Sequence, residues 1–368
     1  MTLALIELRR AKLRFGLLAG AVALLVFLVL FLATLGRTLL GFSTGALANS
    51  SADALVYNPA AHRNLQASRL DPSVAGRVAA VAGVAAAAGV GQTTITADAG
   101  RGPVTLTLFG IQPGQPGTPA KLIGGRLPGP GEALVDRADA ASGFRIGREV
   151  TLQPGGRRLR IVGVSVDSRY QAGPTAYTTL EEWRAVLRSG KPDVTQLPLN
   201  LIAVRAAPGV AAATLARRID QAVAGTESLD RSSAVAAIPG VALIGMTFDL
   251  LIGIAFAITV LVVGCFFLIL TVQKLRVLRA LRALGAATGW LARSLLAQIA
   301  ILVVAGVALA TAALAVAAAS SGPSFPIGVD PGLVAEVLAA AMACSLAAAV
   351  LPIRRIAGLD PAAASHSR

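Results

Sequence analysis

The segment Phe15–Leu35, FGLLAGAVALLVFLVLFLATL, decides the fold class of this chain. It is uncharged over about 20 residues, and a helix that rises about 1.5 Å per residue needs that length to cross a hydrocarbon core. Basic residues crowd positions 9–14 just before it, so the positive-inside rule predicts a cytoplasmic N-terminus. A cleaved signal peptide ending near Ala46-Leu47-Ala48 is the alternative. The apolar run exceeds the roughly 7–15 residues of a signal core, which favours a permanent span.

The composition places the chain among membrane proteins. Its 368 residues are 55% hydrophobic and the mean hydropathy is +0.70, which is more apolar than a soluble domain. A net charge of +14 would also fit a nucleic-acid-binding protein. Aromatic residues make up only 4%, too few for base stacking, and arginines flank the apolar segments as topology signals do. We therefore expect a lipid membrane, and no nucleic acid, as a partner.

Cysteine, histidine and lysine usage argues against an enzyme or a metal site. Cys265 and Cys344 lie in apolar segments, so the polar central region is expected to fold without a disulfide. His62 and His366 lie far apart, and no Cys or His pair has the spacing of metal ligands. No lysine precedes Ser or Thr, so a Walker A motif is absent, and no catalytic triad is evident. We predict no cofactor in this chain, and any ATP-driven activity would have to come from a separate subunit.

Three further apolar segments follow the polar region. Val241–Val272 is apolar except for Asp249, while Leu295–Ala319 and Leu333–Leu351 carry few polar groups. Basic residues at 274–293 mark a cytoplasmic loop, so both termini are expected on the cytoplasmic side of the membrane. The predicted fold is a membrane protein with four transmembrane α-helices, one N-terminal and three C-terminal, and a large α+β extracytoplasmic domain between the first and second. The predicted segments are a cytoplasmic amphipathic segment 1–14, first span 15–36, extracytoplasmic domain 37–240, second span with stalk 241–272, cytoplasmic coupling helix region 273–294, third span 295–319, outer loop 320–332, fourth span 333–352 and cytoplasmic tail 353–368.

Alternating and turn-forming residues outline the extracytoplasmic domain. Residues 93–97 and 104–109 alternate around a Gly/Pro turn and predict a β-hairpin. Residues 149–153 and 158–166 flank Pro-Gly-Gly and predict a second. Residues 201–223 read as a strand, a Pro-Gly turn and an Ala-rich helix, which makes the domain α+β.

Several polar residues have a structural explanation that competes with a functional one. Asp249 lies about two turns from the outer start of its helix, which favours a headgroup-level or stalk position over a proton relay. Glu336 lies close to the outer end of the fourth span. The run Arg157, Arg158 and Arg160 would suit an anionic lipid or polymer, but a solvated strand edge is favoured.

Two distant motifs point to a known family. Residues 276–286, RVLRALRALGA, form a basic amphipathic helix with a glycine break, and Arg282-Ala-Leu-Gly-Ala resembles a cytoplasmic element of FtsX-like, or MacB-type, permeases of ABC transporters. Residues 351–361, LPIRRIAGLDP, are similar to the closing element of that family. Residues 8–14 and the string Gly125-Arg126-Leu127-Pro128 also fit, and the resemblance covers nearly the whole chain.

The resemblance implies a homodimer in a bacterial inner or plasma membrane. It would dock on two copies of a MacB/LolD/FtsE-type ATPase, which would bind ATP and Mg. Closure of the ATPase would push on the cytoplasmic helix between the second and third spans. Val277 and Arg279 replace an acidic residue and a glycine common in the family, and Gln298 replaces a glutamate, so no electrostatic latch is carried over. Gly285 and Gly306 match and are expected to permit a tight turn and close helix packing. The expected docking residues are Arg276, Arg279, Arg282, Leu284 and Gly285, supported by Arg354 and Arg355.

Two functions of different kinds fit this resemblance. The leading one is a permease that converts ATP hydrolysis into motion of the outer domain and exports or extracts an amphipathic molecule such as a lipid, lipopeptide or peptide antibiotic. The alternative is a non-transporting FtsX-like transmitter that activates a cell-wall hydrolase outside the cell. An extracytoplasmic adaptor or hydrolase is a candidate partner, and a small-solute importer has little support because no polar cluster lies at mid-membrane.

Overall fold

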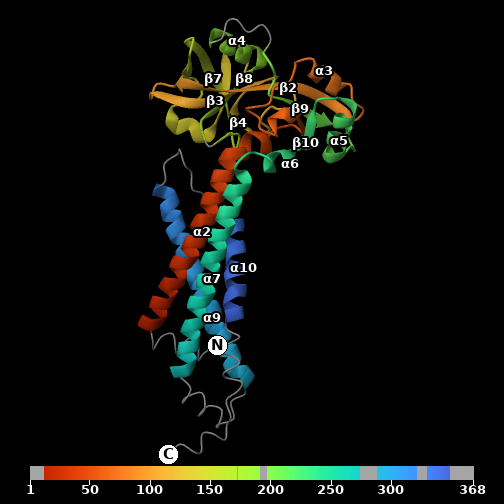
Figure 1. Cartoon of the computed structure of the whole chain (residues 1–368). Coiled ribbons are helices and arrows are strands. Elements are labelled where there is room, and N and C mark those ends of the chain that lie inside the picture. The colour runs from red at the N-terminus through yellow and green to blue at the C-terminus, as the bar shows by residue number, and fades with distance from the viewer. Residues whose placement is uncertain (1–11, 172, 191–196, 274–287, 321–329, 349–368) are drawn as a thin grey trace, which may run out of the picture. The chain divides into compact units, whose positions relative to one another are not determined.

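The computed structural model describes residues 12–171, 173–190, 197–273, 288–320 and 330–348. The chain divides into two compact units. One consists of the apolar helical segments, and the other is the sheet domain formed by residues 37–245 (Figure 1).

Among the described residues, the larger parts of four apolar helices belong to the first unit, in agreement with the predicted one-plus-three arrangement. They are α2 (Lys12–Ala48), α7 (Val241–Gln273), α9 (Thr288–Ser320) and α10 (Pro331–Ala348). The segments Ala19–Ala48, Val241–Cys265 and Leu296–Ser320 are each long and apolar enough to cross a membrane. The described part of α10 is shorter, and the last residues of the predicted fourth span lie outside the described residues.

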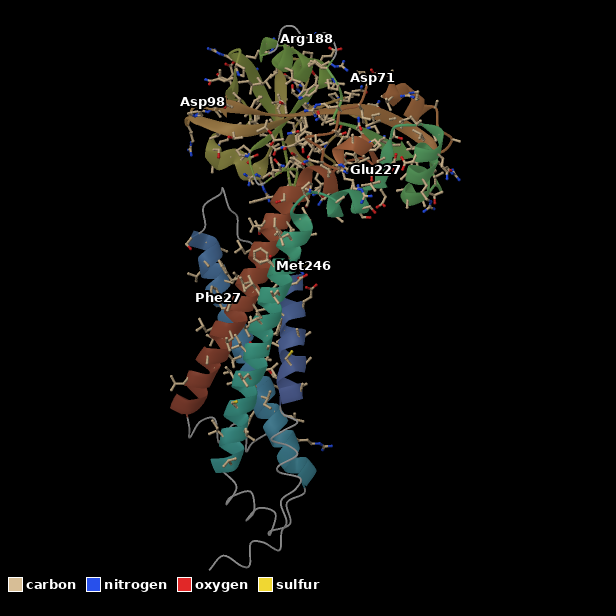
Figure 2. All side chains as sticks on the ribbon, viewed as in Figure 1. Phe27, Asp71, Asp98, Arg188, Glu227 and Met246 are labelled. Carbon is tan, nitrogen blue, oxygen red and sulfur yellow. The ribbon has the colours of Figure 1, made fainter. Side chains whose placement is uncertain are left out.

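Aliphatic side chains and two close glycine contacts hold these helices together. Val22, Val26 and Leu30 of α2 pack with residues of α7, α9 and α10 in one buried cluster. A Cβ on Gly306 would lie 2.8 Å from Val22 Cγ1, so the predicted close packing at Gly306 is confirmed. Gly36 is equally close to the ring of Phe248. The side chains on these helices are almost all carbon (Figure 2), and α7 leaves large ones such as Met246 72% exposed.

The second unit is built on one ten-stranded sheet with the strand order β10-β1-β9-β2-β3-β8-β5-β7-β4, in which β6 also pairs with β2 and β7. The strands are β1 Ala54–Tyr57, β2 Val84–Asp98, β3 Pro103–Ile111, β4 Leu122–Gly125, β5 Glu132–Asp136, β6 Glu149–Gln153, β7 Arg157–Ser165, β8 Thr175–Thr179, β9 Leu201–Ala206 and β10 Glu227–Asp230. The helices are α3 Val74–Ala79, α4 Leu180–Gly190, α5 Ala212–Ala222 and α6 Arg231–Ala236, with short 3₁₀ turns η1 Pro59–Ala61 and η2 Arg137–Ser142.

Both predicted hairpins are confirmed. β2 pairs with β3 antiparallel from Gly91↔Gly110 to Asp98↔Pro103, and β6 pairs with β7 antiparallel. The predicted strand and helix after position 200 are β9 and α5. Turn glycines and period-two alternation made these segments predictable, because both features depend on a few neighbouring residues.

Strand β2 joins the two halves of the sheet domain. Its first part, Val84–Val90, pairs with β9, and its second part, Gly91–Asp98, pairs with β3. Helix α5 contacts β1 and β10, α3 contacts β2, and α4 contacts β3, β8 and β2. At the change of partner, Gly91 and Gly110 leave room for the buried side chain of Trp183, whose ring atoms come within 2.6 Å of where their Cβ atoms would be. The two glycines therefore allow α4 to pack closely on the sheet through Trp183.

The family-like string after β4 forms a tight turn. Gly125 adopts φ 75°, and a Cβ there would lie 2.0 Å from the carbonyl oxygen of Val162. Arg126 meets Glu132 through both guanidinium nitrogens, at 2.6 and 2.5 Å, and the Gly129 amide donates to the same carboxylate at 2.9 Å. The Arg126 hydrogen bond, followed by the one from Gly129, lowers the pKa of Glu132. These residues therefore have a structural role.

Candidate functional site

The predicted ATPase-docking residues all lie outside the described residues. They are Arg276, Arg279, Arg282, Leu284 and Gly285 in the segment 274–287, and Arg354 and Arg355 in the segment 349–368. Their role stays a prediction. The candidate site that the structure does describe is the place where α2 enters the sheet domain.

Helix α2 continues past Gly36, where the predicted span ends, to Ala48. The residues from Arg37 to Gly45 include no proline, and the two glycines there weaken a helix without ending it. The last turns of α2 therefore lie within the sheet domain. Ala46 and Leu47 are buried there in a cluster with Leu55, Phe109 and Tyr177.

A loop between β7 and β8 holds these last turns, and we call residues 166–171 with 173–174 the latch loop. The Ala46 amide donates to the Arg169 carbonyl at 2.8 Å, and the Asn49 side-chain amide donates to the Asp167 carbonyl at 2.7 Å. The Gln171 amide reaches the Ser43 carbonyl at 3.5 Å. Asp167 and Gln171 adopt φ 55° and 56°, conformations that non-glycine residues rarely adopt. The latch loop is thus joined to the end of α2 by two main-chain hydrogen bonds and to the next residue by one hydrogen bond from the Asn49 side chain.

Gly45 allows this close approach. A Cβ at Gly45 would lie 2.6 Å from the Asp167 carbonyl oxygen and 3.1 Å from that of Arg169. A real side chain does not tolerate such a distance, so any other residue at position 45 must push the latch loop away. Gly41, one turn earlier, has nothing within 4 Å of the same position.

Arg169 links the latch loop to both the helix and the sheet. Its guanidinium carbon lies 4.3 Å from the centre of the Phe42 ring, a cation–π contact with α2. Its Nε lies 3.0 Å from Asp139 Oδ1, and the two side chains are only 8% and 0% exposed. Breaking a buried pair by removing one partner leaves an uncompensated charge, which costs about 3–5 kcal/mol. Arg169 is therefore expected to fix the loop strongly.

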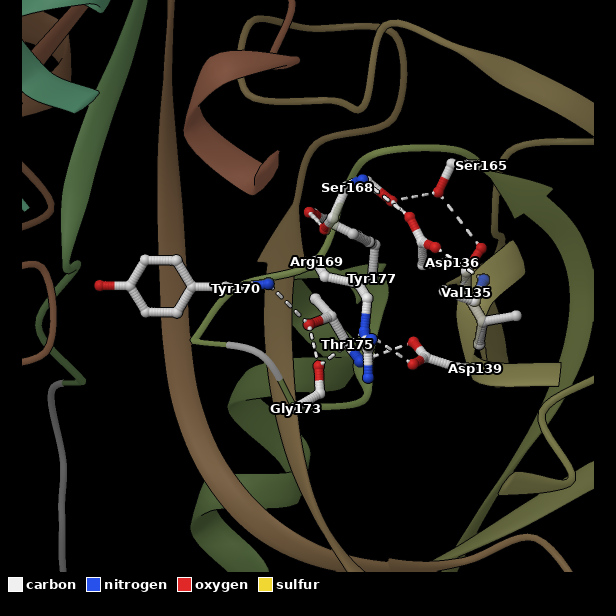
Figure 3. A network of polar contacts seen from close by, with 11 residues as sticks. Val135, Asp136, Asp139, Ser165, Ser168, Arg169, Tyr170, Gly173, Thr175 and Tyr177 are labelled. Atoms are coloured by element: carbon white, nitrogen blue, oxygen red, sulfur yellow. Dashed lines mark hydrogen bonds and ion pairs between the residues drawn. The ribbon is translucent and has the colours of Figure 1, made fainter. Parts of the chain in front are cut away.

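A second carboxylate organises the rest of the latch loop (Figure 3). Asp136 accepts hydrogen bonds from the amide and hydroxyl of Ser168 at 2.7 and 2.9 Å. The Ser165 and Ser168 hydroxyls lie 2.5 Å apart, and Tyr177 donates to the Ser168 carbonyl at 2.5 Å. Burial raises the pKa of Tyr177 well above its usual value, so its hydroxyl stays protonated and remains a donor.

The carboxyl group of Asp139 also has a raised pKa. Burial raises the pKa of Asp139 to about 7, because desolvation outweighs the attraction of Arg169 and the hydrogen bond from the Thr175 amide at 3.0 Å. Asp136 adds to the rise. Arg169 is paired with Asp139, whereas Asp136 accepts from Ser168 and from the Ala138 amide at 2.8 Å. The network is closed to solvent, which suits an anchor rather than a reaction centre.

The start of α7 reaches the same hydrophobic cluster. Ile238 is buried in it and Val241 packs against it. Just before, Arg231 donates to the Ser50 carbonyl at 2.9 Å and its amide donates to the Asp53 carbonyl at 3.0 Å. The end of α2 and the beginning of α7 therefore share one cluster, which we call, together with the latch loop, the joint.

Sequence reasoning missed the joint. Its polar residues come from positions 136–139 and 165–177, which meet only because β5 and β7 are parallel neighbours. The segment Ser165–Thr175, SVDSRYQAGPT, is polar and ends a predicted strand, but no feature of its sequence predicts that it contacts α2. The arginine run on β7 is explained in part by ion pairs, with Arg157 2.6 Å from Glu182 and Arg158 3.7 Å from Glu149. That favours the structural interpretation given above.

Comparison with known proteins identifies both parts of the chain. Residues 15–222 match the family described as MacB-like periplasmic core domain, and residues 250–361 match the FtsX-like permease C-terminal family. An uncharacterized ABC transporter permease of Mycobacterium tuberculosis strain H37Rv is 26% identical over 292 residues, covering 78% of this chain and 76% of the relative. Its counterpart in strain CDC 1551 / Oshkosh gives the same values.

Two solved structures are also similar to part of the chain. The periplasmic region of MacB from Actinobacillus actinomycetemcomitans has a TM-score of 0.37 and 16% identity, covering 52% of this chain and 92% of that one. The extracellular domain of the noncanonic ABC-type transporter YknZ from Gram-positive bacteria has a TM-score of 0.32 and 15% identity, covering 49% and 100%.

Proposed function

Because the chain belongs to the family of FtsX-like, MacB-type ABC transporter permeases, we propose that it converts ATP hydrolysis by a partner subunit into movement of its extracytoplasmic domain. ATP and Mg are bound by that partner, and this chain supplies the membrane helices and the moving domain. The N- and C-termini lie in the cytoplasm, on the side of the ATPase.

The observation that carries the proposal is the joint. Helix α2 is uninterrupted from Lys12 to Ala48, so a displacement of its membrane part would be passed along one continuous helix. At its outer end the Ala46 amide, Phe42 and Gly45 are all in contact with the latch loop. The loop is fixed to β5 and η2 by buried carboxylates at positions 136 and 139. A moving α2 would therefore carry the sheet with it instead of sliding past.

We propose that two copies of the chain act together with two MacB/LolD/FtsE-type ATPase subunits. The docking surface on this chain is formed by Arg276, Arg279, Arg282, Leu284 and Gly285, with support from Arg354 and Arg355. The exposed apolar face of α7, which includes Leu243, Met246 and Leu250, is suited to lipid or to the second copy.

The work done outside is, in this proposal, export or extraction of an amphipathic molecule such as a lipid, lipopeptide or peptide antibiotic. Purification from the native membrane in mild detergent, followed by mass spectrometry, tests the partners directly. An ATPase, alone or with a membrane-fusion adaptor, supports export, whereas an ATPase with a secreted hydrolase supports signalling instead. Absence of any ATPase would contradict the whole proposal.

Charge reversal tests the docking surface in the same experiment. Arg282→Glu should reduce the yield of the co-purified ATPase, because a repelling charge replaces a basic contact. Arg368→Glu makes the same change in the C-terminal tail and serves as the control. Full recovery of the ATPase with Arg282→Glu would place docking elsewhere.

A further inference from the structure

The sheet domain carries an open hollow that no part of the proposed mechanism uses. It has a volume of about 640 Å³ and lies between the C-terminal turns of α3 and α5. Arg77 and Arg218 line it together with Gln221, and the apolar lining includes Val81 and Val223. We call it the α3–α5 hollow; both helices lie on the β9 and β10 half of the sheet (Figure 1).

The fold directs both arginines outward at this place. Helix α3 buries Val74 and Val78, and α5 buries Leu215 and Ile219, so Arg77 and Arg218 occupy the opposite faces and are exposed. The chain turns at Gly83, which follows α3 and directly precedes β2 and adopts φ 98°. Nη1 of Arg218 lies 3.2 Å from where a Cβ on Gly83 would be, so this guanidinium lies over the turn.

These two charges are not neutralised by the part of the chain that the structure describes. There, Arg77 and Arg218 form no side-chain hydrogen bond or ion pair, whereas Arg217 donates to the Thr214 hydroxyl at 3.3 Å. Asp71 feels the charge of Arg77, but its carboxylate accepts the Ser73 amide at 2.8 Å. Residues 37–240 contain 21 Lys and Arg against 14 Asp and Glu, so the domain as a whole attracts anions.

The lining defines the chemistry of a ligand. Guanidinium groups bind phosphate and carboxylate oxygens through paired N–H donors, and they do so better than lysine. A site with a few placed polar groups over an apolar floor is typical of small-molecule binding. Here Val81 and Val223, with neighbouring alanines, supply the floor. A free anion would use the arginines alone, whereas an anion attached to an apolar body would use both parts.

We propose that the α3–α5 hollow binds the anionic head group of an amphiphile, with Arg77 and Arg218 contacting the anion and the apolar floor contacting the adjoining carbon chain. This assignment goes beyond the proposed function, because it requires neither ATP hydrolysis nor an ATPase subunit. Binding is measured on the full chain alone, so failure of this proposal would leave the proposed function unaffected.

The test uses the full chain in nanodiscs of phosphatidylcholine and titrates dihexanoyl phosphatidic acid by calorimetry, with empty nanodiscs subtracted. We expect saturable binding that weakens about five- to tenfold in Arg77→Gln and in Arg218→Gln, and that is lost in the double variant. Arg217→Gln removes a neighbouring charge on α5 outside the hollow and should bind as the wild type does.

Three outcomes would overturn the proposal. One is the absence of saturable binding to the wild type, and the second is equal affinity of the wild type and the double variant. The third is inorganic phosphate binding as tightly as phosphatidic acid, because the apolar floor would then contribute nothing and the hollow would be a site for a free anion. An equal loss of affinity in Arg217→Gln would show general charge attraction in place of a defined site.

Discussion

Replacing Gly45 with alanine should loosen the latch loop from α2. The new Cβ would lie 2.6 Å from the Asp167 carbonyl oxygen, so the loop must retreat by about 0.8 Å to reach an ordinary contact of 3.4 Å. A retreat of that size stretches the Ala46–Arg169 hydrogen bond, now 2.8 Å, beyond the usual range.

The cost follows from three contributions. Overpacking costs about 1–3 kcal/mol, and a lost main-chain hydrogen bond costs about 0.5–1.5 kcal/mol. Alanine in place of glycine stabilises the helix by up to about 1 kcal/mol, which offsets part of this. We expect the free energy of opening the latch loop to fall by about 1–2 kcal/mol, which speeds amide exchange about five- to thirtyfold.

Hydrogen exchange on the full chain in nanodiscs measures this effect at the amides of Ala46 and Gln171. Gly41→Ala is the matched control, because the same methyl group one turn earlier meets nothing within 4 Å. It should leave both amides unchanged or more protected. Unchanged exchange at both amides in Gly45→Ala would refute the reasoning that the close contact holds the loop.

Three further variants test the buried acid, the helix packing and the coupling loop. Burial raises the pKa of Asp139 to about 7 from 3.8, so the folded chain holds more protons between about pH 4 and 7 and loses stability as pH rises through that range. In the wild type the unfolding temperature, measured by the fluorescence of buried Trp183, should therefore fall between pH 5 and pH 8, and Asp139→Asn should remove this fall. If the unfolding temperature of Asp139→Asn still falls as steeply, another group is responsible for the pH dependence. Gly306→Val should weaken the helix unit by about 1–3 kcal/mol, measured by thermal unfolding in detergent, while Gly253→Val, which meets nothing within 4 Å, should not. Gly285→Val should distort the turn that the sequence predicts at this position and lower ATP hydrolysis of the reconstituted complex, and full activity would remove this position from the mechanism.

Local sequence features predicted much of the architecture. The long apolar helices and the two hairpins follow from length, alternation and turn chemistry, which depend on neighbouring residues only. The first half of β2, with its run Val84–Val90, VAAAAGV, could not be recognised in this way. Alanine and glycine have low strand propensity, and this segment becomes a strand because β9 pairs with it.

The joint depends on contacts between residues far apart in the sequence. Gly45 is required by a carbonyl group at position 167, and Arg169 is held by Asp139 from another strand connection. Neither requirement leaves a periodic pattern. The sequence predicts a short basic helix with a glycine break at the expected docking residues, and their role stays a prediction because they lie outside the described residues.

Strand β2 restricts how the extracytoplasmic domain can be divided. Its 15 residues span about 50 Å and are paired with β9 and then with β3, without an intervening linker. A cut within β2 would leave each fragment with a newly unpaired strand edge, which invites aggregation. Expression of either half alone is therefore expected to give insoluble protein, and recombination between relatives would have to exchange the domain as one module.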